Sequence, residues 1–422
     1  MESSSTRKLK FLLVAPSYAC KPITGGGQRT SLIYQALTQL GDVDVLLLGY
    51  QEADVFRPYF PGANALYIVK PDENIGSTFW RLIRPVSPKL VDGAASVLGG
   101  RKLLYQPDSN IAPFLDNLQD KYPYDFVVGR YLRPSARAGA LHANKVPVIL
   151  DIDDRDDVIY KSRINRPGTN PLQQLIFQRY IQQMKVVMAD LLPRCQHVWL
   201  ASDQDLSEVQ HPSKSVLPNI PYTSSGGSQT LDSSIVNANA DSKTVLFVGS
   251  FGHRVNREGV ERFITRCWPA IHSAVDGANL RIVGSGGWES IKDDFSHLPT
   301  VNIVGFVDSL EKEYEQAAFA IAPLFEGGGT KIKVLESLFY HRTAVVTDYA
   351  QYGYETLKHK ESLWVCTDEA ALIQGCIELL NNPDLRSQMA ADGHAQVVQR
   401  YSFGYFSDLV NKTVSSLLKP LE

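Results

Sequence analysis

The chain has 422 residues, of which 44% are apolar and 21% are charged, a composition that excludes disordered and collagen-like proteins. At about 150 residues per domain, this length predicts two or three domains. The net charge of −3 provides no general attraction to nucleic acid, so no nucleic-acid partner is expected. Residues 1–220 hold 25 basic and 21 acidic side chains and the rest of the chain holds 17 and 24, so the first half is the one expected to face an anionic surface.

Short, continuous apolar runs in the first half are typical of buried parallel strands. They are LKFLLVAP from residue 9, VDVLLLG from 43, ALYIV from 65, YDFVVG from 124, VPVILDI from 146 and HVWLAS from 197. Helical stretches lie between several of them, so the pattern predicts βαβ units and a twisted parallel sheet with helices on both faces. A stretch rich in Ser, Gly, Asn and Asp follows at residues 223–242 and is predicted to be a linker.

The second half repeats this pattern. Its runs are TVLFVGS from residue 244, LRIVGSG from 280, VNIVGF from 301, FAIAPL from 319 and TAVVTD from 343, and a helical stretch is expected from about Asp384 to Leu418. The predicted fold class is therefore α/β, with two doubly wound lobes. The predicted order is a lobe at 1–222, the linker at 223–242, a lobe at 243–404, and a helix at 405–422 that packs back towards the first lobe. Ligands of such sheets lie beyond the carboxyl ends of the strands, here in a cleft between the lobes.

Cysteine usage and hydropathy predict a cytosolic protein. The five cysteines are odd in number and widely spaced, without a CxxC pair, which favours a reducing compartment. About seven apolar residues precede Pro16, too few for the apolar region of a signal peptide. No other uninterrupted apolar run reaches the roughly 18 residues that a membrane-spanning helix needs.

The sequence PLFEGGGTKIKVLESLFYH, residues 323–341, is the strongest functional signal. An apolar strand ends, three glycines follow, and a helix is expected to begin near Thr330. Amides of the glycine turn and of the helix N-terminus can hold a phosphate, and Lys331 and Lys333 in the first turn oppose the helix dipole, which indicates an anionic partner. Glu336 lies one turn further, placed to accept hydrogen bonds from ribose hydroxyls. The alternative is a flexible turn with solvated lysines and a Lys333–Glu336 pair.

This stretch matches neither GxxxxGK[ST] nor GxGxxG, and it closely resembles the donor-binding signature of glycosyltransferase family 4, glycosyl transferases group 1. The stretch VLFVGSFGHRVNREG, from residue 245, resembles the start of that family's C-terminal lobe, and VNIVGFVDSLEKEYEQAAFAIAPL, from residue 301, continues it in register. The resemblance covers roughly residues 243–400. The first half resembles the family more loosely, through its Gly25–Gly27 loop and VLPNIP.

The resemblance implies the GT-B fold, which has two Rossmann-like lobes facing a central cleft. It also implies a nucleoside diphosphate sugar donor on the C-terminal lobe, a saccharide or lipid-linked acceptor on the N-terminal lobe, a retaining reaction, and no obligatory metal or other cofactor. Carried over by position, Glu336 would bind the ribose, Gly327–Thr330 the diphosphate and sugar, and Gly305–Val307 the base edge. The full donor set implied in this way is Ser250, Arg254, Gly305, Phe306, Val307, Gly327, Gly328, Gly329, Thr330, Lys331, Lys333 and Glu336.

Two departures from the family's pattern concern charge near the donor. The family's paired glutamates usually have seven residues between them, whereas Glu326 and Glu336 have nine, so a glycine is expected in the place of the first glutamate. Ser250 stands where the family usually has an arginine. Arg254 or Arg257 is expected to supply the missing charge, together with Lys331 and Lys333.

A third departure lies in VPVILDIDDRDDVIY, where many family members have a histidine and this chain has Asp153 and Asp154. A carboxylate there can bind a sugar hydroxyl or orient an acceptor, so both are predicted as catalytic residues beside Lys333. Asp151 and Asp153 also form a DxD, which can hold a divalent ion through carboxylate oxygens. A solvated acidic loop that caps a helix is the third interpretation.

Two further segments of the first half have a functional and a structural interpretation. Gly25, Gly26 and Gly27, followed by Arg29, open a predicted helix, and in family members this loop faces the donor phosphate and the acceptor; the alternative is a simple turn. Residues 77–104 combine five basic residues with one acid and Trp80, which suits peripheral contact with the anionic inner face of a membrane. A solvated helical hairpin is the alternative, because Pro85 and Pro88 interrupt a long amphipathic helix.

The sequence therefore predicts a retaining glycosyltransferase in polysaccharide or glycoconjugate synthesis. In a front-face reaction the leaving phosphate can accept the proton of the acceptor hydroxyl, so the histidine is dispensable. Two alternatives stay open: a catalytically silent nucleotide-sugar binding protein, and a nucleotide-sugar epimerase of the same fold.

Overall fold

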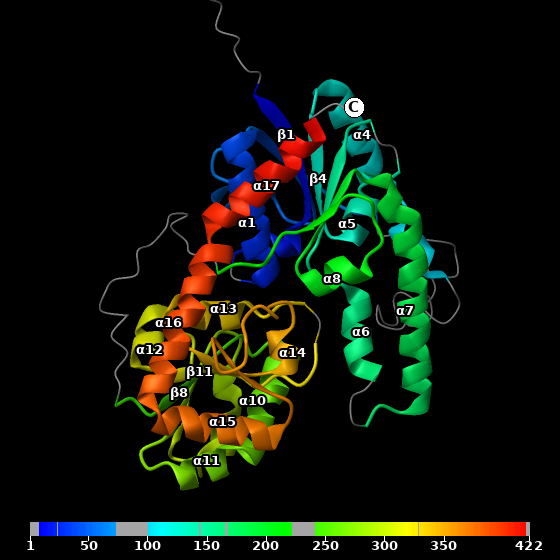
Figure 1. The fold of residues 1–422 in the computed structure, drawn as a ribbon. Coiled ribbons are helices and arrows are strands. Elements are labelled where there is room, and N and C mark those ends of the chain that lie inside the picture. The colour runs from blue at the N-terminus through cyan, green and yellow to red at the C-terminus, as the bar shows by residue number, and fades with distance from the viewer. Residues whose placement is uncertain are drawn as a thin grey trace, which may run out of the picture. The chain divides into compact units, whose positions relative to one another are not determined.

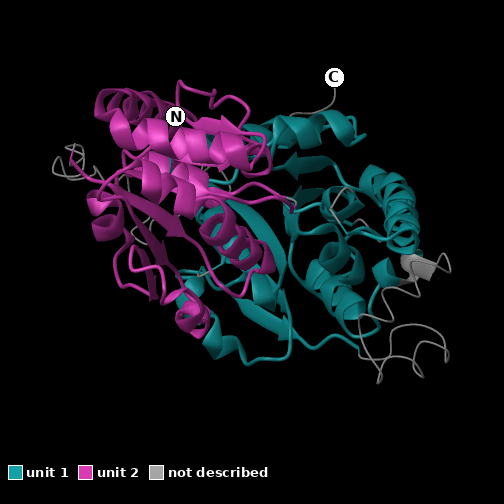
Figure 2. Ribbon diagram, turned by 90° about the horizontal axis from the view of Figure 1, so that it is seen from below, with its two compact units in different colours: residues 1–226, 403–422 teal, residues 227–402 magenta. Residues whose placement is uncertain are grey.

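The computed structural model describes residues 8–22, 24–72, 100–142, 145–164, 168–221, 241–327 and 329–418. The chain divides into two compact units, residues 1–226 with 403–422 and residues 227–402, shown in two colours in Figure 2. Each unit has its own parallel sheet with flanking helices and its own apolar core (Figure 1). The predicted α/β fold class with two doubly wound lobes is confirmed.

The first unit has a seven-stranded parallel sheet with the order β3-β2-β1-β4-β5-β6-β7. The strands are β1 Leu9–Pro16, β2 Gly41–Leu48, β3 Leu66–Val69, β4 Phe126–Arg130, β5 Val148–Ile152, β6 His197–Leu200 and β7 Lys214–Val216. The apolar runs of the sequence account for the first six. No apolar run predicts β7, because it is a half-buried edge strand of three residues, KSV, which is too short and too polar to form one.

The α-helices of the first unit are α1 Gly25–Leu40, α4 Ile111–Lys121, α5 Leu132–Arg137, α6 Asp156–Ile164, α7 Pro171–Leu191, α8 Asp203–Glu208 and α17 Phe403–Leu418, with short 3₁₀ turns at Ser17–Ala19, Ala53–Val55, Arg57–Tyr59, Gly100–Tyr105 and Leu192–Arg194. Helix α17 packs on α1 (Figure 1). Its buried Phe406, Val410 and Val414 recur every four residues and form one apolar stripe. Thr413 of this helix accepts a hydrogen bond from Nε1 of Trp199, on β6, at 3.0 Å.

The second unit has a six-stranded parallel sheet with the order β10-β9-β8-β11-β12-β13. The strands are β8 Thr244–Val248, β9 Asn279–Val283, β10 Val301–Gly305, β11 Phe319–Ala322, β12 Ala344–Thr347 and β13 Trp364–Cys366. Five of them lie in the predicted apolar runs. The sixth, β13, has only three residues and no such run.

The α-helices of the second unit are α10 Arg254–Arg266, α11 Trp268–Ala274, α12 Leu310–Gln316, α13 Ile332–Phe339, α14 Asp348–Gln351, α15 Glu369–Asn381 and α16 Pro383–Arg400, with 3₁₀ turns at Trp288–Ile291 and Asp293–Phe295. The helical stretch expected near the C-terminal end is two helices, because α16 ends at Arg400 and α17 begins at Phe403. Among the described helices, none combines the length and the apolar character needed to cross a bilayer.

The parallel sheets determine where ligands can bind. Because all strands of a sheet point the same way, the loops that follow them gather along one edge, where open α/β sheets bind their ligands. In the second unit this edge holds the loops after β8, β10 and β11. In the first unit it holds the loops after β1, β4 and β5.

Candidate functional site

The glycine turn of the second unit lies after β11. Gly327 and Gly329 have φ angles of 112° and 68°, in the region that favours glycine, while Gly328 lies outside the described residues. Helix α13 begins at Ile332, two residues after the predicted start near Thr330, because Lys331 has the non-helical angles φ −105° and ψ 88°. The Nζ of Lys331 turns back and donates to the carbonyl of Gly329. Lys331 thus lies on the turn, and only Lys333 lies inside the helix.

Lys333 is half-buried at this edge. Its Nζ donates to Oδ1 of Asn256 at 2.7 Å and lies 4.2 Å from the centre of the Phe247 ring. Gly249, which follows β8, leaves room for it, since a Cβ there would come within 2.6 Å of Nζ. Burial, and then the charge of Lys331, lower the pKa of Lys333 to about 7. An anion bound here would stabilise the charged form.

Asn256 is a site residue that the sequence analysis did not identify. It lies in the first turn of α10, where its Nδ2 donates to the carbonyl of Ser250 at 2.9 Å, while its Oδ1 accepts from Lys333. It therefore joins the loop after β8 to the first turn of α13. Asn256 is an uncharged residue within GHRVNREG and belongs to no motif that the sequence displays. Its contacts with Ser250 and Lys333 are visible only in the tertiary structure.

Glu336 lies one turn beyond Lys333 on α13. Its Oε2 accepts from the hydroxyl of Tyr314 at 3.2 Å, and the Tyr314 ring stacks on Tyr340 with the centroids 4.9 Å apart. Burial raises the pKa of Glu336 to about 7, against the opposing effects of the Tyr314 hydroxyl and Lys333. A half-buried carboxyl group is thus held in one orientation beside the glycine turn, as the predicted ribose contact requires.

Arg254, predicted to contact the donor, is engaged by two carboxylates in the structure. It begins α10, its Nη1 donates to Oε2 of Glu258 at 2.7 Å, and its Nη2 contacts Oε1 of the buried Glu326. Glu326 is therefore the ion-pair partner of Arg254. Lys333, by contrast, donates to the amide oxygen of Asn256.

The other predicted donor residues lie along the same edge. Ser250 belongs to the loop after β8, and Gly305 ends β10. Phe306, which follows it, leaves 70% of its surface exposed. Three strand spacings separate β10 from β11 in the sheet order, or about 14 Å. The segment Gly305–Val307 and the glycine turn are thus well separated along one edge of the sheet.

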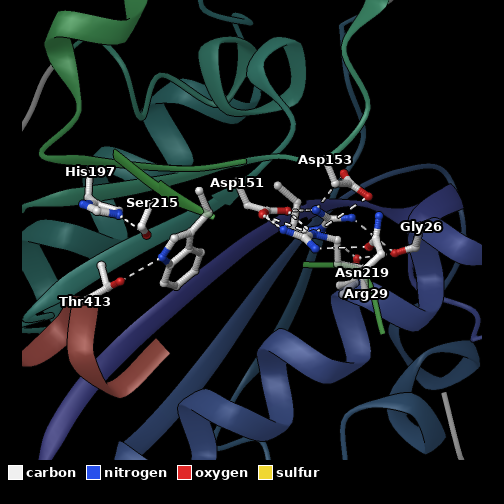
Figure 3. A network of polar contacts seen from close by, with 11 residues as sticks. Gly26, Arg29, Asp151, Asp153, His197, Ser215, Asn219 and Thr413 are labelled. Atoms are coloured by element: carbon white, nitrogen blue, oxygen red, sulfur yellow. Dashed lines mark hydrogen bonds and ion pairs between the residues drawn. The ribbon is translucent and has the colours of Figure 1, made fainter. Parts of the chain in front are cut away.

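In the first unit, the DxD aspartates are buried in a cluster with two arginines. Nη2 of Arg29 donates to Oδ1 of Asp151 at 2.5 Å, and Nη1 of Arg29 donates to Oδ1 of Asn219 at 3.1 Å (Figure 3). Nη1 of Arg130 donates to Oδ1 of Asp153 at 3.0 Å and also contacts Asp151. Burial acts to raise the pKa of Asp153, but the charges of Arg130 and Arg29 outweigh it and lower the pKa.

This cluster corrects two expectations of the sequence analysis. Arg29, expected in a loop that faces a phosphate, points inward and is fully buried, because Asp151 and Asn219 bind its guanidinium. Asp153 is not part of a solvated loop, whereas Asp154 is exposed. The DxD carboxylates are engaged by arginines, and no group of three or more His, Cys, Asp or Glu in the described ranges is placed to hold a metal ion.

The Gly25–Gly27 loop opens α1 as predicted. Oγ1 of Thr24 caps the helix by accepting from the amide of Gly27 at 3.2 Å. The carbonyl of Gly26 accepts from Nη2 of Arg130 at 3.3 Å, and a Cβ on Gly26 would lie 2.5 Å from the Tyr131 hydroxyl. The loop is therefore fastened to β4, through Arg130, and glycine is needed there for close packing against the chain itself.

Two predicted segments lie largely outside the described residues. Of the segment 77–104, only residues 100–104 are described, and of the linker 223–242 only residues 241 and 242. The peripheral membrane contact and the cytosolic location stay predictions.

The site residues of the second unit lie in a range of the chain that matches a known protein family. A family model described as Glycosyl transferases group 1 matches residues 242–382, a range that contains Asn256, Lys333 and Glu336. No curated protein sequence matches the chain.

Solved structures match the whole chain at low identity. Sucrose-phosphate synthase from Thermosynechococcus elongatus is 13% identical, with a TM-score of 0.63, over 97% of this chain and 99% of that one. HepE from Anabaena in complex with UDP is 12% identical, with a TM-score of 0.61, over 97% and 100%. A TarM variant from S. aureus in complex with fondaparinux, α-GlcNAc-glycerol and UDP is 10% identical, with a TM-score of 0.61, over 97% and 100%. These likenesses show the GT-B fold, with two Rossmann-like lobes.

Proposed function

We propose that this protein is a retaining glycosyltransferase of family 4 and of the hexosyl type, acting in polysaccharide or glycoconjugate synthesis. The main support is one turn of α13 that places half-buried Lys333 and half-buried Glu336 beside the glycine turn. The family match includes this turn and helix. Similar structures of HepE and TarM contain UDP, which makes a nucleoside diphosphate sugar the donor to test first.

In this proposal, the two lysines bind the diphosphate of the donor. Lys333 is held in place by Asn256 before the ligand arrives, so little reorganisation is needed when negative charge develops on the leaving group. Preorganised donors of this kind contribute about 3 to 4 kcal/mol each to transition-state stabilisation. Amides of the glycine turn add further donors.

The nucleoside would occupy the rest of the edge. Glu336, oriented by Tyr314, accepts hydrogen bonds from ribose hydroxyls. The exposed ring of Phe306 offers an apolar face to the base near Gly305 and Val307. The separation of about 14 Å along the sheet suits a ligand with a base at one end and a diphosphate at the other.

The reaction transfers a glycosyl group and balances without an external oxidant or reductant. The oxygen of the acceptor hydroxyl bonds to the anomeric carbon while the bond from that carbon to the diphosphate oxygen breaks. The hydroxyl proton leaves with the nucleoside diphosphate, so no protein base is required. This scheme agrees with the burial of Asp153 among arginines, and the neighbouring Asp154 is exposed.

Substitution of the two α13 residues tests the proposal. UDP-, GDP- and ADP-sugars are screened by thermal shift, since a ligand that binds the folded state raises the unfolding midpoint. With the donor that binds, Lys333→Ala is expected to lower the turnover by about 10² to 10³-fold, and Glu336→Ala to weaken donor binding. The exposed Lys292→Ala and Glu361→Ala serve as matched controls. Full donor affinity and turnover in both α13 variants would reject the proposal.

The products distinguish the two alternatives. Transfer or slow hydrolysis of the donor, with the anomeric configuration kept in the NMR spectrum of the product, supports a retaining transferase. Donor binding without either reaction identifies a silent binder. Conversion of the donor to an isomer in the absence of an acceptor identifies an epimerase.

A further inference from the structure

Helix α7 of the first unit has apolar side chains on two faces. The buried face belongs to the core of the first unit and consists of Tyr180, Met184, Val187 and Leu191. Outside this face, Leu172, Leu175 and Val186 leave 66%, 51% and 63% of their surfaces exposed. Packing on one core requires one apolar stripe, so the fold of the first unit does not explain the second set.

The three exposed apolar side chains lie on one side of the helix. Positions 172, 175, 179, 182 and 186 are three or four residues apart, which places them above one another on a helix. Arg179 and Gln182, which lie between the apolar positions, are also exposed. These five residues form an outer stripe that spans about 21 Å from Leu172 to Val186, at about 1.5 Å per residue.

The outer stripe has a well-ordered support. Figure 1 shows the first half of α7 beside α6 and away from the sheet, and the ring centre of Tyr160 on α6 lies 3.7 Å from that of Tyr180 and 5.4 Å from that of Phe177. At the start of α7, Oδ1 of Asn170 accepts from the amide of Gln173 at 2.8 Å, and Oε1 of Gln173 accepts from the amide of Asn170 at 3.2 Å. This capping box holds the first turn of the helix.

The segment that carries the outer stripe is positively charged. Residues 158–189 hold five basic residues and no acidic one, whereas 45 acidic residues in a chain of 422 would place about three in a segment of this length. Arg179 belongs to the outer stripe, and Lys185 is exposed beside Val186. Exposed apolar side chains and exposed positive charges thus occur together on α7.

Two acidic residues at the base of α6 and α7 are paired with cations. Nζ of Lys102 lies 3.0 Å from Oδ2 of Asp190, the acidic residue near the end of α7. Nζ of Lys161 donates to Oε2 of Glu208, on α8, at 2.9 Å. Because these carboxylates are compensated, the surface around the outer stripe stays positive.

We propose that the outer stripe of α7 lies on an anionic lipid bilayer. The exposed leucines and Val186 would enter the boundary between headgroups and acyl chains, while Arg179 and Lys185 face the lipid phosphates. An anionic leaflet attracts basic groups that lie close to its surface. This contact is separate from the segment 77–104 discussed above, and it does not rest on the proposed function.

A bilayer fits this surface better than a protein partner does. Apolar and polar positions alternate along a narrow stripe, whereas a stable protein interface buries about 800 Å² on each partner. A second copy of this chain would also bring like charges together. A lipid surface presents apolar and anionic groups side by side along the whole length of the stripe.

Co-sedimentation of the full chain with unilamellar vesicles tests the proposal. The vesicles consist of phosphatidylcholine alone or of phosphatidylcholine with about 30% phosphatidylglycerol. The wild type is expected to bind the anionic vesicles in about 0.1 M NaCl and to bind them more weakly in about 0.5 M NaCl, because salt screens the attraction. Binding to phosphatidylcholine alone should be much weaker.

Two double variants separate the charged and the apolar contributions. Arg179→Gln with Lys185→Gln should weaken binding about thirtyfold, since each basic group near the surface contributes about fivefold. Leu172→Ser with Leu175→Ser should weaken it by at least about tenfold through the loss of apolar burial.

Matched controls replace exposed residues elsewhere in the chain. They are Lys292→Gln with Lys358→Gln, and Val398→Ser with Leu418→Ser. Both double controls should bind the anionic vesicles as the wild type does.

A fluorescent label locates the contact without removing it. The five cysteines of the chain are buried, so a thiol-reactive NBD dye is expected to react selectively with a cysteine introduced by Leu175→Cys. Its emission should shift to shorter wavelength and become brighter with anionic vesicles, because the dye leaves water. The same label introduced by Val398→Cys should not respond.

Four results would overturn the proposal. The first is the absence of binding by the wild type to anionic vesicles, and the second is equal binding by the wild type and both stripe variants. The third is binding to soluble poly-glutamate in place of vesicles, which would identify an acidic protein as the partner. The fourth is a dimer in sedimentation velocity that Leu172→Ser with Leu175→Ser abolishes, which would identify a second copy of the chain.

Thermal unfolding of the same variants provides the remaining check. The leucine variant is expected to keep the unfolding midpoint of the wild type, because both side chains are exposed. A clearly lowered midpoint would mean that the outer stripe packs within the chain, and the proposal would be wrong.

Discussion

The cationic side chains at the two sheet edges have different kinds of partner. At the edge of the first unit, Arg29, Arg130 and Arg155 are buried and bound by carboxylates. At the edge of the second unit, Lys333 has an amide oxygen as its partner and Lys331 a backbone carbonyl. Lys333 therefore keeps a charge that a bound anion could neutralise.

This difference shows that net charge is a poor guide to the site of an anionic ligand. Residues 1–220 have a net charge of +4 and the remainder −7, yet Lys333, a cation that donates to an amide oxygen, lies in the second unit. Whether a cation can bind an anionic ligand depends on whether a carboxylate already forms an ion pair with it. A count of charges along the chain cannot show this, because the partners are distant in sequence: Arg29 and Asp151 are 122 positions apart.

The largest effect is expected from breaking the buried cluster of the first unit. Arg130→Met removes the partner of two buried carboxylates and should lower the free energy of unfolding by about 3 to 5 kcal/mol, measured by urea denaturation. Arg130→Met combined with Asp153→Asn should recover part of this loss, because one uncompensated charge disappears. A loss below about 1 kcal/mol would mean that the cluster behaves like a surface ion pair, and the contrast between the two edges would fail.

A smaller effect should appear in the pH dependence of donor binding. Because the pKa of Lys333 is lowered to about 7, the free protein loses this cation as the pH rises through 7, and affinity for UDP-glucose should fall by up to about tenfold per pH unit above it. Lys333→Arg keeps its charge over this range, and its calorimetric profile should lack this fall.

The titration of Glu336 changes the affinity for UDP-glucose in the opposite direction to that of Lys333. Its pKa is raised to about 7, so rising pH makes it a better acceptor for ribose hydroxyls. Measurement in a Glu336→Gln background removes this contribution and should steepen the fall due to Lys333. The absence of any fall above pH 7 in the Glu336→Gln background would show that Lys333 does not bind the diphosphate.

The smallest of these effects is expected at Asn256. Asn256→Ala removes the acceptor of Lys333 and the donor to Ser250, and the loss of about 1 kcal/mol for the hydrogen bond to Lys333 predicts a roughly fivefold weaker binding of UDP-glucose. Asn256→Asp keeps an acceptor for Lys333, and a carboxylate there would create in the second unit the arrangement of the first. It should therefore weaken binding of the diphosphate more than Asn256→Ala does. The opposite order would contradict the comparison.

The sequence predicted the fold better than the site, for physical reasons. Strands such as β1 and β8 are buried on both faces, so their apolar runs are continuous and visible in the sequence. Short edge strands such as β7 have no such run. Glycines and lysines near α13 form a local motif, and their placement on one turn could be predicted.

The interactions that decide how the site residues behave are not local. Nothing in the sequence indicates that Arg254 pairs with Glu326, 72 positions away, or that Asn256 holds Lys333, 77 positions away. The Tyr18–Tyr131 stack likewise joins loops after two different strands. Such contacts depend on how the strands are ordered in the sheet, which apolar periodicity does not specify.

Helix α17 has a consequence for how the protein is made. It packs on α1 and accepts a hydrogen bond from Trp199, so the first unit includes residues on both sides of the second unit in the chain. A ribosome must therefore synthesise all of residues 227–402 before the last helix of the first unit exists. The second unit can fold as soon as it emerges, whereas the first waits with the α1 surface uncovered, and a nascent chain arrested before residue 403 would expose that apolar surface to chaperones.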